Sequence, residues 1–283
     1  MTKIHTTTQR HAVGVTGPAG AGRSDTPPDP PEHDQLRLIT RRRSLALIGG
    51  TGAGLLGIRA VGGVGVAVAK SSTASAASAC VLVAEQEVGP FYVAYDKLRP
   101  DITSGAAGLP LELRIRVINA TTCRMIKGAA VDIWQCDALG VYSDESSENT
   151  LGKTYLRGVQ LTDRHGWVTF KTIYPGHYAG RTGHIHAKVH IGGSVHDATL
   201  TGGHVSHIGQ LFPPDVVNAE VYKLAPYREE TVAIVTHAED RVWTQEHGTE
   251  SQLKITRVGN RLANGLIGTI TLAVNPQIVP AAV

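Results

Sequence analysis

Aromatic side chains, cysteines and strongly apolar runs are all scarce in this sequence. Aromatic residues make up 5% of the chain, and three cysteines are too few and too far apart for a zinc knuckle or a disulfide-stapled scaffold. The net charge of +3 is small and the arginines form no basic stripe, so nucleic acid is not suggested as a partner. The chain is, by contrast, long. Its 283 residues, 42% of them hydrophobic, suffice for one large domain or two small ones.

The N-terminal region has the composition of a targeting segment. Residues 1–39 are rich in proline, glycine, threonine and charge without apolar periodicity, which predicts disorder. Residues 40–79 contain paired arginines at Arg41 and Arg42, a glycine- and alanine-rich apolar run, and an Ala-x-Ala end at Ala79. Arginines directly before the apolar run resemble a twin-arginine signal. We therefore predict export by the twin-arginine machinery and an extracellular or cell-surface location.

Three other interpretations of this segment stay open. A membrane anchor would need about 20 strongly apolar residues, whereas this run is glycine-rich and interrupted by Arg59. The residues before Cys80 also resemble a weak lipoprotein cleavage box, with alanine where leucine is usual, which makes a lipid anchor at Cys80 the second alternative. The third is a disordered tail that is never cut, which the correct order of the three signal regions disfavours.

Residues 80–283 are predicted to form one all-β domain. Nearly every periodic segment there alternates apolar and polar residues, and none shows a long helical stripe. Short strands separated by glycine-rich turns are typical of a two-sheet β-sandwich, here with long active-site loops. Residues 163–166 predict a hairpin turn, residues 192–209 a solvated glycine-rich loop or lid, and residues 215–222 a short helix. The predicted strands are 111–118, 131–134, 159–162, 167–173, 184–191, 233–236, 253–258 and 267–273.

The strongest local signal for chemistry lies in residues 172–190. His184 and His186 alternate with apolar residues, so on a strand they share one face about 6 to 7 Å apart and can grip one metal ion. His190 shares that face but lies about 13 Å beyond His186. A Gly- and Pro-containing loop before the strand can swing Tyr178 over the pair. Phenolate oxygen suits a hard, oxidised metal such as ferric iron.

These residues taken alone leave other readings open. The two histidines also fit the polar edge of a strand, or two of three zinc ligands completed by His196, His204 or His207. A lone tyrosine after a glycine, as at Tyr142, is more often a rim residue than a ligand.

The combination of motifs is more specific, because over residues 80–275 the chain resembles the intradiol ring-cleavage dioxygenases, the group of the catechol and protocatechuate enzymes. Val88 stands where an acidic residue is more usual in that family. The matching motifs, in order, are Gly89-Pro-Phe-Tyr92, Val131-Asp-Ile-Trp134, Asp137-Ala-Leu-Gly-Val-Tyr-Ser143, Leu156-Arg-Gly-Val-Gln160, Thr172-Ile-Tyr-Pro-Gly176, Arg181 with His184-Ile-His186, and Gly209-Gln-Leu-Phe212.

The resemblance implies a site and a reaction. Tyr142, Tyr178, His184 and His186 would hold a non-haem Fe(III) ion, and O2 would cleave the ring of a small aromatic diol between its hydroxyl-bearing carbons to a cis,cis-muconate-type diacid. Tyr178 would also leave the metal and accept a substrate proton. Arg181 would stabilise charge on the ring, accompanied by Gln210. A homodimer is the default assembly for the family.

Two rival functions are kept. One is a secreted β-sandwich module that binds iron or aromatic ligands without turnover, against which Arg181 beside the complete Tyr/Tyr/His/His set argues. The other is a zinc hydrolase, for which no carboxylate is suitably spaced as a general base. We further expect Trp134 to pack between the sheets, Cys136 to be a buried thiol, and Cys80 to pair with Cys123 after export.

Overall fold

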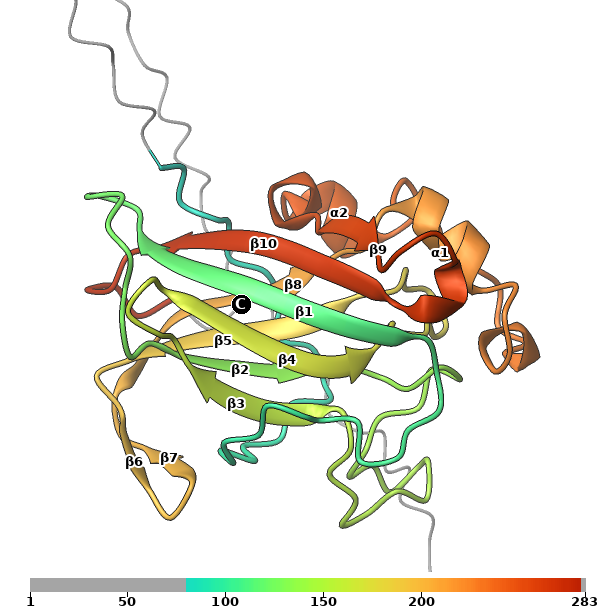
Figure 1. Ribbon diagram of the computed structural model, residues 1–283, viewed down its shortest axis with the longest axis horizontal. Coiled ribbons are helices and arrows are strands. Elements are labelled where there is room, and N and C mark those ends of the chain that lie inside the picture. Colours follow the sequence, from blue (N-terminus) through green and yellow to red (C-terminus); the bar gives the residue numbers. More distant parts are fainter. Residues whose placement is uncertain (1–79, 281–283) are drawn as a thin grey trace, which may run out of the picture. The chain divides into compact units, whose positions relative to one another are not determined.

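The computed structural model describes residues 80–280, which form two four-stranded β-sheets (Figure 1). The first has the strand order β4-β1-β10-β9 and the second β3-β2-β5-β8, while β6 and β7 make a separate ribbon. The predicted all-β sandwich is confirmed. The strands are β1 (Pro110–Asn119), β2 (Ala130–Trp134), β3 (Arg157–Leu161), β4 (Trp167–Ile173), β5 (Ile185–Ile191), β6 (Ser194–His196), β7 (Thr199–Thr201), β8 (His204–Leu211), β9 (Lys254–Arg257) and β10 (Leu266–Val274).

Short helices connect the later strands, and α1 confirms the helix predicted near residue 215. They are α1 (Asp215–Val221), α2 (Arg241–Gln245) and the 3-10 turns η1 (Tyr227–Glu229), η2 (Gly248–Ser251) and η3 (Leu262–Asn264). None of the helices within residues 80–280 is both long and apolar enough to cross a membrane. The segments predicted as disordered and as an export signal lie outside the described residues.

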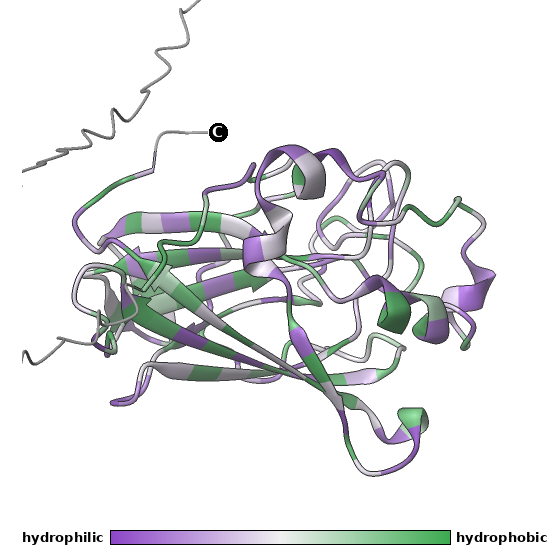
Figure 2. Cartoon of the chain, turned by 90° about the horizontal axis from the view of Figure 1, so that it is seen from above, coloured by the Kyte–Doolittle hydropathy of each residue, from purple (hydrophilic) through white to green (hydrophobic). Residues whose placement is uncertain are grey.

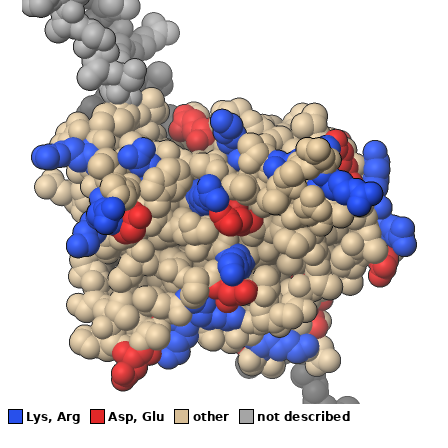
Figure 3. Space-filling view, viewed as in Figure 1, with Lys and Arg blue, Asp and Glu red and all other residues tan. Residues whose placement is uncertain are grey.

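Alternation along the strands builds the core between the two sheets. In β1, Leu113, Ile115 and Val117 are fully buried, whereas Arg114 between them is exposed. Figure 2 shows this alternation of apolar and polar positions along the strands. Each such buried aliphatic side chain contributes about 1.5 to 3 kcal/mol. On the face turned to the viewer in Figure 3, acidic and basic side chains are interspersed rather than gathered by sign.

The second sheet is buried on both faces, and its outer face carries the candidate site. Val131 and Ile133 of β2 belong to the core between the sheets, so Asp132 and Trp134 point to the opposite face. Trp134 is buried there in a separate cluster with Cys136 and Tyr142. The expectation that Trp134 packs between the sheets is therefore wrong, because Val131 and Ile133 occupy the inward positions of β2 and alternation turns Trp134 to the other face. Cys136 is a buried free thiol, as predicted.

The turn at residues 163–166 does not close a hairpin. The Asp163 amide donates to the Trp167 carbonyl and Gly166 adopts a φ of +78°, as the turn signal requires. However, β3 pairs with β2 while β4 pairs with β1 in the other sheet. The chain thus crosses from one sheet to the other at this turn. A turn signal fixes the chain reversal but not the partner strand.

The expected glycine-rich loop over residues 192–209 is also corrected. It contains the β6–β7 ribbon and most of β8, which pairs antiparallel with β5. His207, expected to be solvated, is buried, with Nδ1 3.1 Å from Glu85 Oε1. Conversely, the strand predicted at 233–236 is irregular loop. Both errors arise because the hydrogen-bond partner of a strand is distant in sequence and leaves no local pattern.

Cys80 and Cys123 form the predicted disulfide, with Cα atoms 5.6 Å apart across a sequence separation of 43. A sulfur in this bond cannot also carry the thioether of a lipid anchor. Because cross-linking restricts the unfolded chain, Cys80→Ser or Cys123→Ser should lower the free energy of unfolding of the oxidised protein by about 3 kcal/mol. The measurement is denaturant unfolding. The double variant should be as stable as either single variant, and a reductant should destabilise only the wild-type protein. If all three variants were as stable as the wild-type protein, the disulfide would be contradicted.

Candidate metal and catalytic site

His186 of β5, His184 directly before that strand and two loop tyrosines converge on the outer face of the second sheet. His184 Nε2 lies 3.2 Å from His186 Nε2 and 3.4 Å from the Tyr178 hydroxyl. The Tyr142 ring centre lies 5.8 Å from that of Tyr178 and 6.3 Å from that of His186. The structure therefore brings together all four side chains that the sequence suggested as metal ligands. His190, further along β5, is not among their ring or hydrogen-bond contacts.

Both histidines are neutral and have a nitrogen aimed into the site. Burial, with the nearby Arg181 charge second, lowers the pKa of His184 to about 3. Burial and the His184 ring likewise hold the pKa of His186 well below its usual value. His184 Nδ1 donates to the Thr182 carbonyl at 2.7 Å, so the neutral ring keeps its lone pair on Nε2. A backbone acceptor on the far nitrogen is the usual way to orient a metal-binding histidine.

The two phenols are buried, and one lacks a partner. The Tyr142 hydroxyl makes no hydrogen bond of normal geometry to any described residue, although Tyr142 is only 2% exposed. Burial raises the pKa of Tyr178 to about 12 and that of Tyr142 well above its usual value. Leaving a buried hydroxyl without a hydrogen bond costs about 1 to 3 kcal/mol of folding free energy. The site therefore contains an oxygen donor that the described part of the protein leaves unsatisfied.

Glycine lets the two tyrosine loops approach backbone to backbone. Gly140 adopts a φ of +78°, and a Cβ there would lie 2.4 Å from the His177 carbonyl oxygen. A Cβ on Gly176 would lie 2.2 Å from the Asp137 carbonyl oxygen, which instead accepts the Gly176 amide at 3.2 Å. Asp137 also folds its own loop, accepting two amides through Oδ1. The loop before Tyr142 is thus clamped against the loop that carries Tyr178.

This clamp yields a stability prediction with a matched control. Gly140→Ala should lower the free energy of unfolding by about 3 kcal/mol, because a left-handed φ and a clash with the His177 carbonyl add together. Gly152 has a similar φ of +74° but open space around it, so Gly152→Ala should cost only about 1 kcal/mol. Thermal unfolding of both variants measures the difference. Equal losses would mean that the close approach of the loops contributes nothing.

Arg157 ties the Tyr142 loop to the segment that covers the site. From β3 it donates to Ser143, through Nε to the hydroxyl at 2.9 Å and through Nη2 to the carbonyl at 2.6 Å. Its Nη1 donates to the Phe91 carbonyl at 2.7 Å. Phe91 stacks on Tyr142 with ring centres 4.4 Å apart and meets Tyr178 edge-on at 5.6 Å. Phe91 therefore covers both tyrosines and keeps water from their rings.

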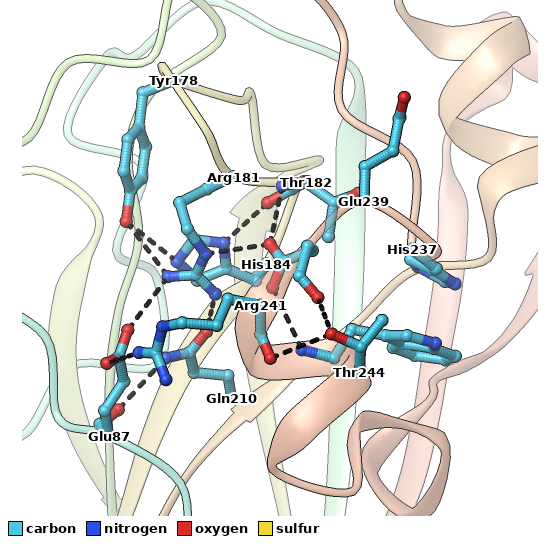
Figure 4. Close-up of polar contacts among 12 residues, drawn as sticks. Glu87, Tyr178, Arg181, Thr182, His184, Gln210, His237, Glu239, Arg241 and Thr244 are labelled. Atoms are coloured by element: carbon cyan, nitrogen blue, oxygen red, sulfur yellow. Dashed lines mark hydrogen bonds and ion pairs between the residues drawn. The ribbon is translucent and has the colours of Figure 1, made fainter.

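The Arg181 guanidinium lies beside Tyr178 and His184 (Figure 4). Arg181 donates through Nε to Asp240 Oδ2 at 2.8 Å and through Nη2 to Gln210 Oε1, while Nη1 lies 3.5 Å from the Tyr178 hydroxyl. Gln210 stands opposite His186 in the β5–β8 register. Both Arg181 and Gln210, singled out from the sequence, are therefore next to the site.

Two acidic residues that hold Arg181 were not predicted. Asp240 is fully buried; burial opposes its charge, but Arg181 and two backbone amides outweigh this and lower its pKa. Glu87 lies 3.7 Å from Arg181 and also pairs with Arg241. Glu87 directly precedes Val88, which stands where an acidic residue is more usual in the intradiol family. Asp240 begins α2 and accepts the Trp243 amide, so its only sequence signal was that of a helix cap.

A cavity of about 370 Å³ opens beside the tyrosines. Phe91, Tyr142 and Tyr178 form its aromatic wall, and Leu139 and Val232 lie among its apolar lining. Its volume is within the range of small-molecule sites. A single aromatic ring fits this space, and the walls come from loops that the sequence could not place.

The donor set fits a metal ion. The spacings of 3.2 and 3.4 Å between neighbouring donors are close to the ~3 Å expected when each lies about 2.1 Å from one ion. The partnerless Tyr142 hydroxyl supplies a further donor. Two of the three histidines considered as a third zinc ligand, both on β8, contact other groups: His204 lies 3.1 Å from the Pro276 carbonyl and His207 faces Glu85. Neither completes a three-histidine zinc site.

Comparisons with known proteins agree with this architecture. A family model described as Dioxygenase matches residues 89–219. An intradiol ring-cleavage dioxygenase from Tetranychus urticae is 32% identical, with a TM-score of 0.62 over 71% of this chain and 98% of that one. A second dioxygenase crystal structure is also 32% identical, with a TM-score of 0.63 over 72% and 98%. A comparison with curated protein sequences found no match.

The fold and the relatives together define a β-sandwich oxidoreductase. This chain belongs to the intradiol ring-cleavage dioxygenases, as its motifs indicated. Enzymes of this family cleave catechol-type rings.

Proposed function

We propose that the protein binds Fe(III) through Tyr142, Tyr178, His184 and His186 and uses O2 to cleave a catechol-type ring to a cis,cis-muconate-type diacid. The observation that carries this is the convergence of two phenols and two neutral imidazoles beside a ring-sized cavity that both phenols line, one phenol having no hydrogen bond of normal geometry among the described residues. Bound ferric iron would supply Lewis-acid activation of the diol.

Tyr178 is suited to accept a substrate proton. Its hydroxyl lies 3.5 Å from Arg181 Nη1 and 3.4 Å from His184 Nε2, at the lip of the cavity. Burial raises its pKa to about 12, so a Tyr178 phenolate would readily take up a proton from the diol. Tyr142 is only 2% exposed and its ring is stacked on Phe91, so it is the more tightly held of the two, which assigns the two tyrosines different tasks.

Arg181 supplies the positive charge for the reaction. It is only 12% exposed, and Asp240 and Gln210 fix its plane on the side away from Tyr178. A preoriented guanidinium in a site that excludes water stabilises negative charge developing on the ring. Phe91, stacked on Tyr142, helps to exclude that water. A module that only binds iron has no need of this arginine.

The test is turnover of catechol by the iron-loaded protein under ¹⁸O2, with products identified by mass spectrometry. The proposal predicts a diacid that contains both labelled oxygen atoms and has lost no carbon. Anaerobic binding of catechol without any product in air would favour the rival binding module. A product formed by breaking a ring bond adjacent to the two hydroxyl-bearing carbons, instead of the bond between them, would contradict intradiol chemistry.

We also propose that the protein is exported and forms a homodimer. The disulfide between Cys80 and Cys123 supports an oxidising destination, and the family commonly dimerises. Fractionation of cells that express the full chain, with Arg41 and Arg42 replaced by lysine as the comparison, tests the twin-arginine route. Light scattering of the purified protein measures its mass, and a monomer would refute the dimer.

A further inference from the structure

The charge of the cavity beside the tyrosines has one sign. Of its lining residues only Glu148 and Glu230 are charged, and both are carboxylates. Glu148 is exposed and Glu230 is half-buried. Glu230 Oε1 accepts the Thr231 and Val232 amides at 2.8 Å each, which holds this side chain beside the cavity. The two carboxylates come from loops more than 80 residues apart in the sequence.

The loop that carries Glu148 adds to this negative charge. Residues 137–152 contain Asp137, Asp144, Glu145 and Glu148 and no lysine or arginine. Charges of one sign around a low-dielectric cleft attract ligands of the opposite sign and repel those of the same sign. The charged side chains that line the cavity are therefore all carboxylates.

The two nearby arginines do not cancel this negative charge. Arg157 is 2% exposed and donates to Ser143 and the Phe91 carbonyl, so it faces away from the cavity. Arg181 is ion-paired with the buried Asp240 and lies 3.7 Å from Glu87. Both cations are thus matched by acceptors of their own. A substituent on a bound ring would meet carboxylates.

Resting on the proposed function, we propose that the site favours aromatic diols with a cationic substituent, such as a protonated alkylamine, over those with a carboxylate. A second observation is the Tyr142 hydroxyl, which has no hydrogen bond of normal geometry among the described residues; Tyr142 lines the same cavity, which marks it as a place where a ligand binds. With the diol oxygens at the tyrosines and histidines, the side chain of the ring extends toward Glu148 and Glu230. Anionic catechols are repelled there.

Three catechols of nearly equal size test the preference. They are 4-(2-aminoethyl)catechol, 4-ethylcatechol and 3-(3,4-dihydroxyphenyl)propionate, which are cationic, neutral and anionic at pH 7. Dissociation constants are measured anaerobically by calorimetry on the iron-loaded full chain, and kcat/KM is measured in air. Partly exposed charge pairs give about a twofold gain and a twofold loss, so the cation should exceed the anion by about fourfold in both quantities.

Charge-neutralising variants locate the effect. Glu148→Gln and Glu230→Gln should each reduce the ratio from about fourfold to about twofold, and high salt should do the same in the wild-type protein. Glu112→Gln removes an equal charge on the outer face of β1, remote from the cavity, and should leave the ratio unchanged. Gln can still accept the amides that Glu230 accepts, which keeps the loop folded.

The outcomes separate this inference from the proposed function. Equal affinities for all three compounds, or tighter binding of the anion, would overturn the charge preference even if all are cleaved. Cation-first binding without cleavage of any compound would support the preference and refute the proposed reaction. An unchanged ratio in both cavity variants would also overturn the inference, because the preference would then have another source.

Discussion

Tyr142→Phe should abolish iron binding and turnover without destabilising the metal-free fold. The Tyr142 hydroxyl is buried and has no partner of normal geometry among the described residues, so its removal strands nothing. Relieving an unsatisfied buried oxygen should raise the free energy of unfolding of the apoprotein by 0 to about 2 kcal/mol. The measurements are iron content by elemental analysis and denaturant unfolding of the metal-free protein. A hydroxyl that binds iron but destabilises the metal-free fold gives these two effects together, the loss of iron binding and the gain in stability of the apoprotein.

Tyr227→Phe is the matched control, with the reverse expectation. The Tyr227 hydroxyl is also buried, but it accepts the Leu109 amide at 3.0 Å and donates to the Tyr174 carbonyl at 2.7 Å. Its loss should lower stability by about 1 to 3 kcal/mol and leave iron binding intact. If Tyr142→Phe retained stoichiometric iron, or lost as much stability as Tyr227→Phe, Tyr142 would be a structural residue and not a ligand.

Replacing Arg181 by glutamine should lower kcat by about 10²- to 10³-fold while iron remains bound. Its guanidinium faces Tyr178 and Gln210 and supplies positive charge where the ring becomes negative. The variant keeps the four proposed ligands, so its metal content should match that of the wild-type protein. Steady-state kinetics with elemental analysis measures both quantities. Arg257→Gln, which breaks a surface pair with Glu220, should change neither.

Asp240 should act through Arg181. It holds Arg181 Nε and the Thr182 amide with one oxygen and the Trp243 amide with the other. Asp240→Asn should therefore lower kcat by about tenfold with little change in KM, and should have almost no further effect in a protein already carrying Arg181→Gln. Additive losses in the double variant would show that Asp240 acts independently of the arginine.

The part of the fold that follows from local alternation was predictable. β1, β4 and β10 each bury alternate residues, and the sequence predicts all three within a residue or two. Strand partners were not predictable, because pairing depends on residues far away in the chain. The turn at Gly166 shows this, because the turn was predicted correctly but the strands before and after it, β3 and β4, belong to different sheets.

The residues of the site likewise divide into those with a local sequence pattern and those without one. His184 and His186 follow from period two along the chain and Tyr178 from the loop just before them, whereas Tyr142 follows only from the family motifs. Asp240 could not be found in advance, because its carboxylate reaches Arg181 across 59 residues and resembles an ordinary helix cap in sequence. Contacts between loops, like those that bring carboxylates to the cavity, depend on the folded arrangement and have no local signature.

The absorption spectrum of the iron-loaded protein tests the central claim most directly. Two tyrosinates on one ferric ion should give a strong visible charge-transfer band, and anaerobic addition of catechol should shift it. Tyr142→Phe, reconstituted with excess iron, should lose the band. A wild-type protein that carries one equivalent of ferric iron and yet is colourless would contradict the account, because Tyr142 and Tyr178 would then not both be ligands.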